Sequence, residues 1–157
     1  MRKKFLNLVF LVLALSSVSA SAGLLGKDAI PAPILEQFYK RNPNAIDISA
    51  EKKTHFKQDL YEISFKVEKD KETIIELYRN NGHFFVGADD VTSANMMPAS
   101  SYDSLKAAFD TYTIKEAILV VNPNGVGEEY DLTVNSSGVD WSVIIDYKGN
   151  IVEKVRD

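Results

Sequence analysis

The segment YEISFKV, residues 61–67, alternates apolar and polar side chains at every position. Successive side chains of a β-strand point to opposite faces of a sheet, so this pattern predicts a strand with one face directed to a core. A second segment, YDLTV at residues 130–134, has the same alternation. The two segments therefore predict equivalent strands in a unit that occurs twice.

The residues around the first of these strands predict the rest of one unit. A helix is expected to begin at Pro31 or Pro33, where a missing N–H costs nothing, and to end at Asn42, because the residue before a proline disfavours helical backbone. Asn81-Gly82 predicts a hairpin, because a type I′ turn needs positive φ. The strands expected in this copy cover residues 45–49, 61–67, 73–79 and 83–88.

The second copy repeats this order. Tyr102, Leu105 and Phe109 form the apolar stripe of a helix that follows Pro98. The strands expected after it cover residues 115–122, 130–134, 139–147 and 151–155. When Tyr61 is aligned with Tyr130, Ile75 and Leu77 align with Ile145 and Tyr147, and all of these side chains are expected to face inward.

We therefore predict an α+β fold, one domain over residues 23–157. Two repeated α-β-β-β-β units, residues 30–88 and 97–157, are expected to form one antiparallel sheet with both helices on one face, and residues 89–96 are the expected linker. The alternative is an ordinary α+β domain whose halves look alike because both follow the same patterning rules.

Residues 1–22 have the three parts of an export signal. Arg2, Lys3 and Lys4 are positively charged, residues 5–15 are apolar, and Ala20-Ser21-Ala22 offers the small residues of a cleavage site. The apolar core is short compared with the roughly 20 residues that span a bilayer. These features predict a periplasmic or secreted protein with no membrane attachment after signal removal.

Charge and composition exclude several classes of function. Loss of the signal removes three positive charges and no negative ones, so the net charge changes from −4 to −7. An acidic surface repels nucleic acid, and no nucleic-acid partner is expected. The chain contains no cysteine, which excludes disulfides, thiol catalysis and thiolate metal sites.

The motifs of both copies resemble those of the PepSY-like family of secreted bacterial proteins. They comprise Ile30-Pro31, NPNA at 42–45 and YEISF at 61–65 in the first copy, and Met97-Pro98, YDLTV at 130–134, DWSV at 140–143 and DYKGNI at 146–151 in the second. That family is related in fold to the β-lactamase inhibitor protein. The resemblance implies tandem units in one continuous sheet, with both helices on one face and the other face open to a partner. It also implies binding or inhibition of secreted enzymes, chiefly peptidases.

The chemistry-bearing residues form no recognisable catalytic or metal-binding motif in the sequence. His55 and His83 lie in different expected elements, without the spacing of a metal-binding pair. Asp89-Asp90 lacks the ordered acidic spacing of a calcium loop. The chain has no G-x-S-x-G motif, so we expect no catalytic residue, no cofactor and no metal ligand.

We therefore predict a non-catalytic exported binding protein that contacts a secreted or envelope protein through the open sheet face. A peptidase inhibitor or modulator is one such role. The alternative is a periplasmic small-molecule carrier or sensor that uses the sheet or the cleft between the repeats. Tyr78 and Ile144 are the expected apolar anchors. The residues expected on the binding face are Glu62, Ser64, Lys66, Glu76, Tyr78, Asp131, Thr133, Ser142, Ile144 and Asp146.

Overall fold

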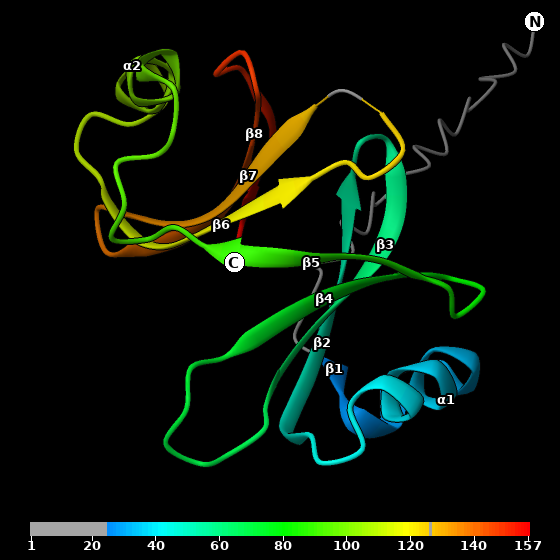
Figure 1. Ribbon diagram of the computed structural model, residues 1–157. Helices are drawn as coiled ribbons and strands as arrows, with labels where there is room; N and C mark the ends of the chain where they lie inside the picture. The colour runs from blue at the N-terminus through cyan, green and yellow to red at the C-terminus, as the bar shows by residue number, and fades with distance from the viewer. Residues whose placement is uncertain (1–24, 126) are drawn as a thin grey trace, which may run out of the picture.

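The computed structural model describes residues 25–125 and 127–157, which form a curled antiparallel sheet and two α-helices (Figure 1). The predicted signal, residues 1–22, lies outside the described residues. None of the helices in the described ranges is long and apolar enough to cross a membrane. The elements are β1 (Leu25–Gly26), the 3₁₀ helix η1 (Lys27–Ala29), α1 (Ala32–Arg41), β2 (Ile46–His55), β3 (Gln58–Lys66), β4 (Ile74–Arg79), β5 (Phe84–Asp90), α2 (Ala99–Ala108), β6 (Thr113–Val121), β7 (Glu128–Ser136), β8 (Val139–Asp146) and β9 (Ile151–Arg156).

Within the described ranges, nine strands lie side by side in chain order, each paired with the next. We call β1 to β5 with α1 the first half of the molecule, and α2 with β6 to β9 the second half. Only two residue pairs, Asp89 with Leu119 and Asp90 with Ile118, join β5 to β6. The sheet is therefore continuous, and its two halves are connected by a narrow strip.

The core of the first half lies between α1 and the sheet. Ile34 and Phe38 of α1 are fully buried. The Phe38 ring packs edge-on against Phe65 at 4.9 Å between centroids and against Tyr78 at 6.2 Å. The helix ends where the sequence predicts, and the Asn42 N–H donates to the Phe38 carbonyl at 2.8 Å.

The core of the second half lies between α2 and its own strands. Leu105 is fully buried, and Phe109 packs edge-on against Trp141 at 5.8 Å between ring centroids. The Lys154 ammonium of β9 lies 4.7 Å from the Phe109 ring and 5.1 Å from the Trp141 ring. Each helix thus packs on the strands of its own half, and the two helices lie at opposite ends of Figure 1.

A third core joins the halves and contains no helix residue. It brings Leu60, Leu77 and Phe85 of the first half against Ile118 and Val120 of the second. We call the sheet surface that carries these residues the helix-free face. Because this face curls onto itself, much of it is interior rather than open to solvent.

The α+β class and the antiparallel sheet are confirmed. The repeat of two units, the placement of both helices on one face and the domain limits stay predictions. Several observed strands are longer than predicted, among them β2, β3, β5 and β7. β2 continues to His55 because it pairs with β3 along its length, and Asp89 and Asp90 belong to β5 because they pair with β6.

The predicted facing of two apolar residues in β4 is also wrong. Leu77 pairs with Glu62, so Leu77 and Ile75 lie on the helix-free face rather than beneath α1. β4 is buried on both faces from Ile75 to Tyr78, so its side chains could not show which face meets the helix. Tyr147, also expected to face inward, follows the end of β8 and is 50% exposed.

The turns after β4 and β8 each place a glycine against the start of a helix. Gly82 has φ of +88°, and a Cβ there would lie 2.5 Å from the Pro33 carbonyl oxygen. Gly149 also has φ of +88°, and a Cβ there would collide with Ser100 of α2. The Ser104 hydroxyl donates to the Gly149 carbonyl at 2.6 Å. Both turns therefore depend on the absence of a side chain.

Replacing Gly82 or Gly149 with alanine should lower the free energy of unfolding by about 2–4 kcal/mol, the combined effect of a left-handed backbone and an overpacked contact. Gly138→Ala is the matched control, because Gly138 has φ of +79° and no atom within 4 Å of an added Cβ. Urea denaturation should give a loss of only about 1 kcal/mol for this control. Equal losses in all three variants would show that the turns do not press on the helices.

Candidate functional site

A cluster of charged side chains is buried on the helix-free face, where the two halves meet. We call it the charged cluster: Lys53, His55, Glu62, Glu129 and Asp131. His55 is 0% exposed, Asp131 4%, Glu62 7% and Glu129 9%. Charged residues are almost never fully buried unless they are paired, so this group is the most unusual chemical feature in the described ranges.

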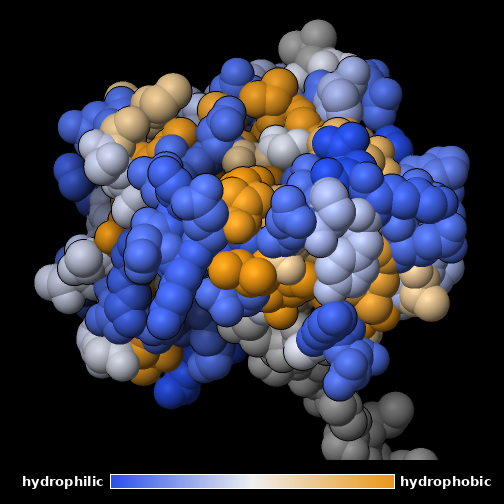
Figure 2. Space-filling view, turned by 60° about the horizontal axis from the view of Figure 1, so that its bottom comes forward, coloured by the Kyte–Doolittle hydropathy of each residue, from blue (hydrophilic) through white to orange (hydrophobic). Residues whose placement is uncertain are grey.

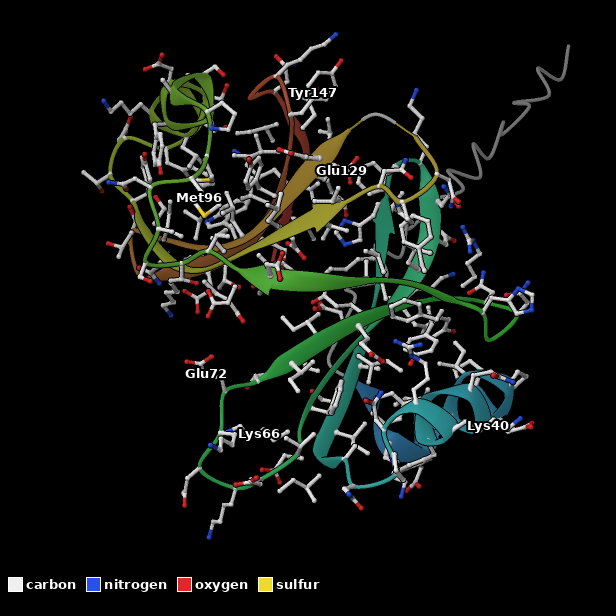
Figure 3. The ribbon with its side chains drawn as sticks, in the orientation of Figure 1. Lys40, Lys66, Glu72, Met96, Glu129 and Tyr147 are labelled. Atoms are coloured by element: carbon white, nitrogen blue, oxygen red, sulfur yellow. The ribbon has the colours of Figure 1, made fainter. Side chains whose placement is uncertain are left out.

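The β2–β3 hairpin carries three members of the cluster to β7. Its turn, Phe56-Lys57, has φ of +51° and +61°, values that residues other than glycine adopt only at some cost. The Phe56 N–H donates to both carboxylate oxygens of Glu129 at 3.0 Å. Figure 3 shows Glu129 where β7 passes the end of this hairpin. The Glu129 carboxylate therefore holds the strained turn against the second half.

Lys53 provides the shortest connection between the halves. Its Nζ lies 2.5 Å from Oδ2 of Asp131 on β7, 3.5 Å from Oε1 of Glu62 and 3.2 Å from Oε2 of Glu51. Hydrogen bonds between ionised partners are about twice as strong as neutral ones. Three carboxylates thus surround one ammonium group that is only 15% exposed.

The His55 imidazole lies between two carboxylates. Nδ1 is 3.4 Å from Oε2 of Glu129, and Nε2 is 3.6 Å from Oε2 of Glu62. These separations are long for hydrogen bonds. Within the described residues, neither ring nitrogen nor Glu62 Oε2 has a hydrogen-bond partner. The His55 imidazole is therefore held by the charges of Glu62 and Glu129 and by packing, and not by short hydrogen bonds.

The cluster shifts the titration of its members. Burial alone would lower the pKa of His55, but the carboxylates of Glu129, Glu62 and Asp131 outweigh it and raise that pKa to about 9. Burial and the charge of Glu62 raise the pKa of Asp131 to about 6, against the opposing effect of Lys53. Burial also acts to raise the pKa of Glu62, but His55 and Lys53 lower it overall. At neutral pH, His55 is therefore a second buried cation.

Stability should fall as the pH rises from 6.5 to 9. The pKa of His55 is raised above its ordinary value of 6.5, so its contribution is complete below 6.5 and disappears as the pH rises through 9. The predicted loss is up to about 3 kcal/mol in the free energy of unfolding. Urea denaturation at several pH values would measure it.

His55→Gln should remove most of this slope, whereas His83→Gln, at an exposed position, should keep it. A slope that persists in His55→Gln would assign the effect to other groups.

Removing one partner of the Lys53–Asp131 pair should cost more than removing both. Asp131→Ala leaves a buried ammonium with less compensation, at a cost of about 3–5 kcal/mol, and Lys53→Met added to it should recover part of that loss. Glu36→Ala is the control, because the pair of Glu36 with Lys40 is exposed to solvent and its loss should change the stability little. A double variant no more stable than Asp131→Ala would contradict the pairing.

The structure separates the predicted binding residues between two faces. Glu76 and Tyr78 lie on the α1 side, where Glu76 accepts hydrogen bonds from the Tyr78 hydroxyl at 2.6 Å and from the Asn42 side chain at 2.8 Å. The remaining predicted residues share the helix-free face, as the strand registers show: Glu62, Ser64, Lys66, Asp131, Thr133, Ser142, Ile144 and Asp146.

The expectation that all of these residues face solvent is wrong for five of them. Tyr78 is 0% exposed, Ile144 3%, Asp131 4%, Glu62 7% and Glu76 9%. Glu76 and Tyr78 are buried because their face of β4 lies beneath α1. Glu62 and Asp131 are buried because the helix-free face that carries them, and also Ile144, meets the other half of the molecule instead of water. Tyr78 and Ile144 therefore cannot act as exposed anchors.

The other predicted residues are only partly buried and keep access to solvent: Ser64, Lys66, Thr133, Ser142 and Asp146. Lys66 lies at the opposite end of the molecule from Glu129 (Figure 3). Because Glu76 and Tyr78 lie on the α1 side and the other predicted residues on the helix-free face, the predicted residues do not form one surface.

Sequence reasoning missed Lys53, His55 and Glu129 as a group. Lys53 and Asp131 are 78 positions apart, and no local pattern connects them. One signal was available: Glu51, Lys53 and His55 alternate with period two and could have extended the predicted strand to its observed end.

A small pocket beside the cluster has a volume of about 20 Å³. Lys53, Glu62, Glu116, Asp131 and Thr133 contribute to its lining. This space is enough for about one water molecule and far too small for a carried organic compound. The pocket therefore lends no support to the small-molecule carrier.

No family model and no curated protein matches the chain. Three solved structures from Bacteroides show a weak likeness. A protein of Bacteroides eggerthii that is proposed to be periplasmic has 14% identity, a TM-score of 0.49, and coverage of 80% of this chain and 88% of its own. DUF2874 family proteins of Bacteroides uniformis and Bacteroides ovatus have 13% and 12% identity and TM-scores of 0.48 and 0.46. Both matches cover 80% of this chain, with 88% and 86% of the respective neighbours. The resemblance to the PepSY-like family and the β-lactamase inhibitor protein is not shown by these matches and stays a prediction.

Proposed function

We propose that this chain is a non-catalytic exported protein that binds a secreted or envelope protein through β9 and the part of the helix-free face next to it. The observation that carries the proposal is the exposure of β9. Every residue of this strand after Ile151 is exposed, Val152 by 56% and Val155 by 38%. Apolar side chains on an exposed strand are a feature of protein-binding surfaces.

The position of β9 at the end of the sheet favours binding by strand addition. In the described part of the chain, β9 pairs with β8 alone, so its outer edge presents free backbone donors and acceptors. Glu153, Lys154 and Arg156 place charges of both signs along this edge. Such charges oppose indiscriminate pairing with other strands and favour a partner of complementary charge.

Two of the predicted binding residues, Ser142 and Thr133, lie near β9 on the helix-free face. Val155 pairs with Ser142 of β8, which in turn pairs with Thr133 of β7. Thr133 and Ser142 are partly exposed. The proposed surface is therefore an edge strand with a short polar strip beside it.

Two further observations support the non-catalytic and exported parts of the proposal. The charged cluster, the densest group of titratable side chains described above, is buried beside a pocket that holds about one water molecule. The basic, apolar and small-residue segments at residues 1–22 have the order of an export signal. A peptidase is one class of partner that would fit, since peptidases bind extended chains.

The proposal retains the predicted arrangement of two repeated units with both helices on one face. The equivalent contacts of Gly82 with Pro33 in the first half and of Gly149 with Ser100 in the second support it.

Substituting the exposed valines of β9 should abolish capture of a partner. The Val152→Lys, Val155→Lys double variant would be compared with the wild type by cross-linking against the envelope and secreted fractions of the producing cell. We expect a partner band that is reduced at least tenfold in the variant.

The control variant is Ile46→Lys, Val67→Lys, because Ile46 is 40% and Val67 43% exposed but neither belongs to β9. On the side of the molecule in Figure 2, apolar patches lie between hydrophilic side chains, so exposed apolar residues are not confined to one site. Loss of the partner in the control but not in the β9 variant would place the interface elsewhere.

A further inference from the structure

The charged cluster contains buried donor atoms whose spacing suits a metal ion better than a hydrogen bond. His55 Nε2 and Glu62 Oε2 are 3.6 Å apart, and neither has a hydrogen-bond partner among the described residues. Two ligands bound at about 2.0–2.1 Å to one tetrahedral zinc ion lie about 3.4 Å from each other. The pair is thus too far apart for a good hydrogen bond and close to the separation of two metal ligands.

Asp131 offers a third ligand. A donor atom from each of His55, Glu62 and Asp131 lies within 4.8 Å of the other two. One imidazole and two carboxylates from β2, β3 and β7 would give three protein ligands. The adjacent pocket has room for the water that completes a four-coordinate site.

Glu129 is placed to orient the histidine. Its Oε2 lies 3.4 Å from His55 Nδ1, the ring nitrogen that faces away from Glu62. The Phe56 N–H holds both Glu129 oxygens at 3.0 Å. A carboxylate on the far nitrogen of a ligating histidine is the usual second partner in zinc sites. Because the same carboxylates keep His55 protonated at neutral pH, a metal ion must displace the Nε2 proton, and Glu129 then holds the remaining proton on Nδ1.

Lys53 competes with a metal ion for the same carboxylates. Its Nζ contacts Asp131 Oδ2 and lies 3.5 Å from Glu62 Oε1, the oxygen that does not face His55. The Lys53 side chain is 15% exposed and has a flexible stem, so it can withdraw toward solvent. The ammonium would then weaken metal binding without blocking Glu62 Oε2.

We propose that His55, Glu62 and Asp131 bind a divalent transition-metal ion of the Zn²⁺ class, with Glu129 orienting His55 and Lys53 competing for the site. A mixed nitrogen and oxygen donor set favours this class over Mg²⁺ and Ca²⁺, which prefer oxygen donors alone. The ion would join the two halves, because His55 and Glu62 belong to the first half and Asp131 to the second. This inference is independent of the β9 surface.

The test is calorimetric titration of the purified full-chain protein, freed of metal, with ZnCl₂. The wild type should bind one Zn²⁺ ion. His55→Gln and Glu62→Gln should each weaken binding at least tenfold, and Glu129→Gln should weaken it by about 10–100-fold. Lys53→Met should strengthen binding about tenfold or more, because it removes the competing ammonium from the carboxylates.

His83→Gln is the matched control, because His83 is exposed and lies outside the cluster, and its affinity should equal that of the wild type. Co²⁺ supplies a second readout, since its visible absorption should show tetrahedral coordination in Lys53→Met and lose it when His55→Gln is added. Circular dichroism of each metal-free variant identifies any that fail to fold. If His55→Gln fails to fold, the affinities of Lys53→Met and Glu129→Gln for Zn²⁺ still test the proposal.

Zn²⁺ affinity unchanged in His55→Gln, or no tighter in Lys53→Met than in the wild type, would overturn the proposal. Binding that is lost in His83→Gln would assign the ion to the surface instead. Equal affinity for Mg²⁺ would exclude a site that depends on the imidazole.

Discussion

The burial of charged side chains between the two halves is the constraint on which the rest of the structure depends. Lys53 and His55 reach β7 from the β2–β3 hairpin, and the carboxylates of Glu129 and Asp131 receive them there. Burying any one of these charges alone would cost several kcal/mol. The hairpin can therefore occupy only the position in which all of them are compensated.

The apolar part of the same interface has less influence on the relative position of the halves. Leu60, Leu77, Ile118 and Val120 would tolerate small shifts, because dispersion contacts have no strict direction. Each charge in the charged cluster instead needs an oppositely charged partner at short distance, and Glu129 must also accept the Phe56 N–H. We infer that hydrophobic burial brings the halves together and that the charges select their register.

Closure of the helix-free face determines which surfaces remain for other molecules. Its central part is filled by side chains from both halves, so a partner reaches only the margins. The exposed strand β9 and the partly exposed Thr133 and Ser142 lie on such a margin. The small pocket beside the charged cluster instead has room for only about one water molecule or ion. The same packing thus leaves β9 exposed for a protein partner and buries the charged cluster, where only an ion or a water molecule fits.

The sequence by itself determined much of the local structure: the α+β class, both helices, most of the strands and the turn at Asn81-Gly82. These features depend on neighbouring residues, such as the proline after Asn42 or the glycine after Asn81. The β2–β3 turn at Phe56-Lys57, which contains no glycine, was not predicted. Only the tertiary structure decided what each strand face contacts. Alternation distinguishes the two faces of a strand but does not say whether the polar one meets water or another polar face. Tyr78 is therefore buried beneath α1, Ile144 is buried on the opposite face, and His55 lies beside carboxylates from other strands.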